Sequence, residues 1–215
     1  MFNTIQDFIM STLISLPGLL IALSFHEFAH AWTANKLGDP TAKNMGRMTL
    51  DPFKHLDPVG FIMLLVVGFG WAKPVMVNPR NYKKPRRDDI LVSLSGPVMN
   101  FCLAFLSYGL YFFVILVLKV ENQIILSVIS ALIIFNVYLC IFNLIPIPPL
   151  DGYHVLKSIL LGKVKPEFFW KLERYGFIIL IALLLLLRNF GILSTIAGAV
   201  LQFIQGFYMN VLGIV

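Results

Sequence analysis

FIMSTLISLPGLLIALSFHEFAHAWT, residues 8–33, is an apolar run long enough to cross a lipid bilayer. It contains no Lys, Arg or Asp, yet two histidines and one glutamate lie close together near its end. Ionisable side chains inside a membrane are costly unless they have partners or a function. The run therefore predicts a membrane-spanning helix that carries a polar site.

The composition of the whole chain also indicates a membrane protein. Of its 215 residues, 58% are hydrophobic and only 13% are charged, which is more apolar surface than a soluble domain of this size can bury. A net charge of +6 would suggest nucleic-acid binding in a soluble protein. Here the basic residues are confined to particular loops, so we expect a lipid bilayer and no nucleic acid as partner. The length predicts a single domain over residues 1–215.

The other apolar runs predict an all-α, polytopic transmembrane helix bundle with about five spans. The run at 175–187 is short but uniformly apolar, and the run at 58–70 is too short to cross comfortably. The latter and the following WAKPVMVNP predict a re-entrant or hairpin segment near 58–80. Runs long enough to span a membrane lie at 8–33, 90–118, 123–150 and 190–215.

The distribution of basic residues predicts the orientation of this bundle. Ten of the 17 Lys and Arg residues lie at 36–87 and five lie at 157–174. Cytoplasmic loops of membrane proteins are enriched in Lys and Arg. Five crossings put both rich loops in the cytoplasm, with the N-terminus outside and the C-terminus inside.

The sequence HEFAH predicts a zinc site with one ion per chain. His26 and His30 are one helical turn apart, so both imidazoles can reach a single ion. Glu27 lies beside them and can accept a proton from a water molecule that the metal activates. The alternative is a helix end with two hydrogen-bonded histidines and no metal.

A third protein ligand is required, and the sequence offers several. His30 lies six residues before Lys36, which is roughly 9 Å along a helix from its basic end. Asp151 closes the 123–150 run, whose end lies on the same side, so the predicted topology favours this residue. His154 suits the role of a residue that contacts a metal ligand and does not bind the metal itself. Three further candidates lie in the loop DPFKHLDP, where a solvated turn is the simpler interpretation: Asp51, His55 and Asp57.

The segment NLIPIPPLDG, residues 143–152, predicts a broken helix. Its three prolines cannot continue a helix and lack backbone donors. An extended strip of this kind can bind an unwound peptide, and Asn143 just before it can hydrogen-bond such a substrate. The prolines are equally compatible with a simple helix stop, and Asn143 with a hydrogen bond between helices.

Three motifs in this order resemble the site-2 protease family of intramembrane metalloproteases: HEFAH, SGPVMN at 95–100 and NLIPIPPLDG. LGDPTAKNMGRMTLDPFKHLDPVG and GFGWAKPV resemble its small bacterial members, and the chain offers no room for the PDZ or CBS domain of larger ones. The resemblance implies His26, His30 and Asp151 as zinc ligands and Glu27 as catalytic general base. It implies substrate contacts for Asn143 and Asn100.

The expected function is therefore that of a zinc metalloendopeptidase of the cell membrane, a hydrolase for regulated intramembrane proteolysis. Its expected partners are transmembrane protein substrates, and its active site is expected toward the cytoplasmic side. The alternatives are a membrane metal-binding or transport protein, since broken helices also occur in transporters, or an inactive scaffold. The oligomeric state stays open.

Overall fold

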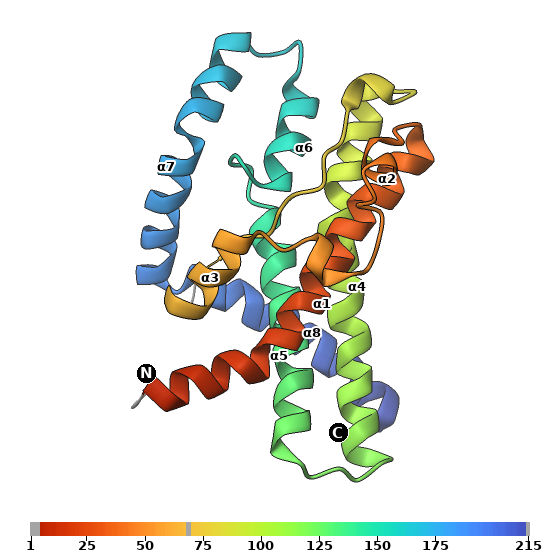
Figure 1. Ribbon diagram of the computed structural model, residues 1–215. Coiled ribbons are helices and arrows are strands. Elements are labelled where there is room, and N and C mark those ends of the chain that lie inside the picture. Colours follow the sequence, from red (N-terminus) through yellow and green to blue (C-terminus); the bar gives the residue numbers. More distant parts are fainter. Residues whose placement is uncertain (1–4, 68–69, 214–215) are drawn as a thin grey trace.

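The computed structural model describes residues 5–67 and 70–213 and is a bundle of α-helices, which confirms the expected fold class (Figure 1). Eight α-helices and two short 3-10 helices, η1 and η2, follow one another in this part of the chain. Their bounds are α1 Ile5–Leu37, α2 Thr41–Asn44, η1 Pro52–Lys54, α3 Pro58–Val67, η2 Pro79–Asn81, α4 Pro85–Leu116, α5 Gln123–Asn143, α6 Asp151–Leu160, α7 Pro166–Phe190 and α8 Ile192–Leu212.

Within the described residues, four helices are long and apolar enough to cross a membrane: α1, α4, α5 and α8. Many large apolar side chains on these helices point outward, such as Leu106 at 65% exposed and Phe203 at 66% exposed. Apolar faces of this extent are unfavourable in water but are solvated by lipid. The chain is therefore a multi-pass membrane protein, as its composition predicts.

Close packing of α1 against α4 and α5 forms the centre of the bundle (Figure 1). A Cβ atom added at Gly18 of α1 would lie 2.7 Å from the backbone nitrogen of Leu132 on α5, so the two backbones are in contact. Ala22 on α1 and Ala104 on α4 have no exposed surface. Small residues at such contacts let membrane helices approach closely. This packing holds the HEFAH turn of α1 against α4.

The segment near 58–80 forms a short helix and a returning extended chain. α3 has ten residues, about 15 Å of helix, which is too short to span a bilayer. Asp57 accepts a hydrogen bond from Gly60 N at its start. Beyond residues 68–69, which lie outside the described part, the chain runs back past the loop before α3, where Lys73 N donates to His55 O. This arrangement agrees with the predicted re-entrant or hairpin segment.

The predicted helix break lies between α5 and α6. α5 ends at Asn143, short of the predicted end of the 123–150 run, because the proline-rich turn follows directly. α6 begins at Asp151. A Cβ atom at Gly152 would lie 2.3 Å from Leu144 O, so the start of α6 is packed directly on the end of α5. The break thus turns the first residue of α6 toward the centre of the bundle.

The C-terminal helices differ from the prediction of five crossings. Residues 175–187 form the second half of α7, whose first half is rich in charged side chains. This apolar half is too short to cross by itself. α8 runs obliquely past α5 and ends toward the α4–α5 connection (Figure 1), where Tyr208 Oη donates to Phe105 O on α4. The described structure therefore supports four crossings and moves the C-terminal end away from the basic loops.

Reporter fusions test this topology. Fusions after Lys84 and Lys165 should report the same side of the membrane, and fusions after Glu121 and Leu212 should report the opposite side. The reason is that α8 ends near the α4–α5 connection, so the chain crosses four times. The activities of paired alkaline phosphatase and green fluorescent protein fusions measure the side. Agreement between the Leu212 and Lys84 fusions would restore the five-crossing topology.

Candidate metal centre

The two histidines of HEFAH face the same side of α1. They lie one turn apart, their ring centroids are 4.6 Å apart, and their Nε2 atoms are only 3.0 Å apart. His26 is 4% exposed and His30 is 8% exposed. A helix places residues i and i+4 on one face, which explains why both rings reach a common point.

The Nδ1 atoms of both rings are engaged in hydrogen bonds that decide the tautomers. His26 Nδ1 lies 2.6 Å from Asn100 Oδ1, and His30 Nδ1 lies 2.8 Å from the carbonyl oxygen of Val92. Because these oxygens only accept, each Nδ1 carries the proton and donates it. In the neutral rings both Nε2 atoms therefore have lone pairs, and these lone pairs face each other.

The orientation of the Asn100 side chain is fixed by two further contacts. Its Nδ2 atom donates to Ala22 O at 3.0 Å and to Asn136 Oδ1 at 2.8 Å, which leaves its oxygen for His26. Asn136 in turn donates from Nδ2 to Leu132 O. Asn100 is completely buried, and its contact with His26 orients that imidazole, while the substrate contact that the resemblance implied stays a prediction.

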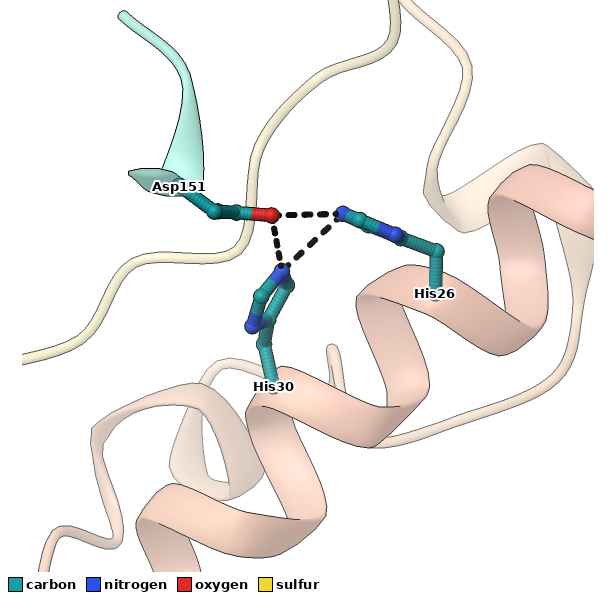
Figure 2. A group of neighbouring side chains, drawn as sticks. All are labelled: His26, His30 and Asp151. Carbon is teal, nitrogen blue, oxygen red and sulfur yellow. Dashed lines mark hydrogen bonds and ion pairs between the residues drawn. The ribbon is translucent and has the colours of Figure 1, made fainter. Parts of the chain in front are cut away.

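Asp151 is brought from the start of α6 to the two imidazoles (Figure 2). Its Oδ2 atom lies 3.2 Å from His26 Nε2 and 3.3 Å from His30 Nε2. This oxygen is buried, and among the described residues the two imidazoles are the polar groups that lie against it. With both rings neutral, three electron-rich atoms converge at this point, an arrangement that a bound metal cation makes favourable.

The spacing of the three atoms suits zinc. Bonds of about 2.0–2.2 Å in tetrahedral geometry separate neighbouring ligand atoms by roughly 3.3 Å. The three separations here are 3.0, 3.2 and 3.3 Å. His26, His30 and Asp151 are also the one group of potential metal ligands that the described residues form. Three protein ligands leave a fourth position for water or substrate, as in catalytic sites.

Gly96 on α4 makes room for the two imidazoles. A Cβ atom at this position would lie 2.4 Å from His30 Nε2 and 2.5 Å from His26 Cε1. Those distances are far below van der Waals contact, so any side chain here would push the rings apart. The glycine of the SGPVMN motif is therefore part of the site because it lacks a side chain.

Glu27 lies next to this triangle and is 8% exposed. Its Oε2 atom accepts a hydrogen bond of 2.8 Å from the backbone nitrogen of Val75, in the extended chain after α3. The contact holds one of the two carboxylate oxygens. Glu27 is therefore a fixed carboxylate beside the three candidate ligands and is not one of the atoms that converge.

The polar loop residues considered as third ligands lie elsewhere. Asp51 accepts from Phe53 N at the start of η1, and Asp57 caps α3 as described above. His55 is buried, and its Nε2 donates to Thr49 O at 2.8 Å. These contacts stabilise turns, which is the simpler interpretation that the sequence offered.

The two remaining predicted residues flank the site. His154 has its ring against Tyr153 on α6 and is outside the group of candidate ligands. Asn143 is half-buried at the end of α5, and its Nδ2 donates to Leu139 O in its own helix. Sequence reasoning did not identify Asn136, although an amide in the middle of an apolar span is a signal for a buried polar contact.

Comparison with known proteins gives one family. The model of "Peptidase family M50" matches residues 14–120 and 114–187. "Putative zinc metalloprotease YwhC" of Bacillus subtilis is 43% identical over 173 residues, which cover 77% of each chain. "Putative zinc metalloprotease Rip2" of Mycolicibacterium smegmatis is 32% identical over 183 residues, 80% of this chain and 67% of the relative. No solved structure matches.

A further relative is similar over a shorter stretch. "Putative zinc metalloprotease MJ0611" of Methanocaldococcus jannaschii is 32% identical over 150 residues, 69% of this chain and 72% of the relative. The names of these relatives and the family match give zinc as the cofactor, as the sequence predicts. Two imidazoles and a carboxylate are a donor set that zinc commonly takes at catalytic sites.

Substitution of Gly96 tests how tightly the site is packed. Gly96→Ala should lower the zinc content of the purified protein by at least about tenfold at micromolar free zinc, because the new methyl group overlaps both imidazoles. Gly198→Ala in α8 is the matched control, since a Cβ atom there meets nothing within 4 Å. Zinc per chain is measured by atomic emission. Unchanged zinc in Gly96→Ala would show that the rings do not bind the metal where they lie now.

Proposed function

The chain belongs to peptidase family M50, the site-2 protease family, and from this we propose that it is an intramembrane zinc metalloendopeptidase. It hydrolyses peptide bonds in or near transmembrane segments of other membrane proteins. The observation that carries this proposal is the convergence of three metal-binding atoms beside a fixed carboxylate, on a helix that is apolar enough to span the bilayer.

In this proposal His26, His30 and Asp151 hold one zinc ion per chain. Support comes from the tautomers that the Nδ1 contacts impose on the neutral rings and from the buried Asp151 oxygen beside both Nε2 atoms. When bound, zinc acts as a Lewis acid that polarises the scissile carbonyl and lowers the pKa of a water molecule. Asn100 keeps the His26 ring in the orientation and tautomer that metal binding needs.

Glu27 is the general base of the proposed reaction. It neighbours His26 in sequence, and its carboxylate accepts a proton from the attacking water and returns it to the leaving amine nitrogen. The Val75 N–H holds Oε2, so the carboxylate is oriented before the substrate arrives. A carboxylate held in this way has no function in a site that only stores or transports metal, which favours the enzyme over the transporter.

The substrate class follows from the surroundings of the site. His30 lies seven residues before the end of α1 at Leu37, about 10 Å along the helix axis. The loops at this end carry most of the basic residues, so the positive-inside rule supports a site within the membrane near the cytoplasm. Substrates that reach it are transmembrane segments, and they must unwind because a helix buries its own peptide groups. Asn143, beside the proline-rich break, remains a proposed contact for the unwound chain.

The assignment of the third ligand is tested by a pair of variants. Asp151→Ala should lose most of its zinc, because two imidazoles alone leave the ion under-coordinated. His154→Ala, three residues along α6, should keep it, because that ring packs against Tyr153 and not on the site. Zinc per chain and melting temperature are measured on both. The opposite pattern, with zinc kept in Asp151→Ala and lost in His154→Ala, would show that Asp151 is not the third ligand.

The catalytic role is tested by Glu27→Gln. The amide keeps the size of the side chain and an oxygen that accepts from Val75 N, but it cannot take up a proton. Cleavage should fall about 10²–10⁴-fold, as is typical for loss of a general base. Zinc content should stay at the wild-type level. The assay follows cleavage of Leu-rich transmembrane peptides with a central helix-destabilising Asn-Gly pair, in detergent micelles. Zinc-loaded wild type that cleaves none of them would favour the transporter or scaffold.

A further inference from the structure

The extended chain after α3, residues 71–78, here called the 71–78 segment, is held in place along its length. Lys73 N donates to His55 O at 2.8 Å near its start, and Asn78 N donates to Asp39 Oδ2 at 2.6 Å at its end. Between them Val75 N donates to Glu27. The segment is therefore fixed on both sides of the point where it contacts the proposed general base.

Arg47 provides a further anchor for the 71–78 segment. It lies in the loop after α2 and is only 8% exposed. Its guanidinium donates to the backbone oxygens of Lys54, of Lys73 at 2.5 Å and of Pro74 at 3.3 Å. In the described part of the chain no carboxylate lies within ion-pair distance of it. A buried charge that contacts only carbonyl groups is costly, so holding the backbone is what this side chain does.

The Arg47 contacts bear directly on Glu27 through one peptide group. Pro74 O and Val75 N belong to the same planar unit, in which the C=O and the N–H point in opposite directions. Arg47 binds the oxygen of this unit, and Glu27 accepts from its nitrogen. Because the unit is rigid, fixing the oxygen fixes the direction of the N–H. The positive charge also polarises the peptide group and strengthens its donation to a carboxylate.

We propose that Arg47 is a positioning residue that sets the orientation of Glu27 through the peptide group between Pro74 and Val75. This inference rests on the proposed function, since it takes Glu27 as the general base. Arg47 itself touches neither metal nor substrate. Its loss leaves the three zinc ligands in place but lets the Glu27 carboxylate rotate away from the water that it deprotonates. The effect therefore falls on kcat and not on zinc binding.

The first readout needs no catalysis. Hydrogen–deuterium exchange of a proteolytic fragment that contains the 71–78 segment reports whether Val75 N–H stays protected. Arg47→Ala should raise the exchange rate of this fragment at least tenfold. Arg47→Lys should restore part of the protection, because an ammonium can still donate to a carbonyl. Arg80→Ala removes the same charge from an exposed position in η2 and is the matched control, with exchange as in the wild type.

The second readout is cleavage of the same Leu-rich peptides. Arg47→Ala should lower kcat at least tenfold, with KM within about twofold and zinc per chain unchanged, since misorientation of a catalytic group by about 1 Å can cost 10²-fold. Val75→Pro, which removes the N–H donor, should produce a similar loss. The double variant should lose no more than the larger single loss, because both changes break one connection.

The outcomes separate this inference from the proposed function. Wild-type protection and wild-type kcat in Arg47→Ala would overturn the inference while leaving the protease intact. Additive losses in the double variant would overturn it too, since Arg47 would then act by another route. If the wild type cleaves no peptide, the proposed function fails, and increased exchange in Arg47→Ala would still establish the hold on Val75. Loss of zinc in Arg47→Ala would show a structural role in the metal site and overturn the inference.

Discussion

The convergence of two imidazole nitrogens and one carboxylate oxygen is the constraint on which the candidate metal site depends. The Nε2 atoms of His26 and His30 point at each other, and Asp151 adds a buried carboxylate oxygen within 3.3 Å of both. In an apolar environment, where water cannot screen it, such a group is strongly unfavourable without a metal. Metal binding is therefore coupled to the packing of the helices that supply the ligands.

Helix packing at the centre of the bundle fixes the positions of the two imidazoles. Contact between the backbones of α1 and α5 at Gly18 sets the position of α1, and Gly96 on α4 leaves the space that the imidazoles occupy. Asn100 and Asn136 then link α1, α4 and α5 through one chain of hydrogen bonds that ends at His26. Within a membrane, polar side chains that bond each other between helices stabilise the bundle and fix its geometry at once.

Local patterns in the sequence allowed part of this arrangement to be predicted. The spacing of HEFAH is a property of one helix, and the apolar runs follow from composition, so the histidine pair and the helical membrane fold could be predicted. Asn100 lies 74 positions from His26, and Val75 lies 48 from Glu27. Contacts between residues so far apart depend on how the helices pack, and their orienting roles were missed. The apolar run at 175–187 was counted as a crossing because hydropathy alone does not reveal that α7 ends in a turn at Gly191, after which α8 takes another direction.

The origin of the third ligand shows why the proline-rich break is needed. The break ends α5 at Asn143 and lets Asp151 begin a new helix with its carboxylate beside both histidines and at the positive end of the α6 dipole. α6 is then held from two sides, by Ser158 donating to Asp89 on α4 and by Tyr153 donating to Glu173 on α7, both at 2.6 Å. Two candidate ligands therefore belong to the packed centre, and the third belongs to a helix held between α4 and α7. The completeness of the candidate site consequently depends on how α6 docks, and this dependence links the loops at the basic end to the two histidines of α1.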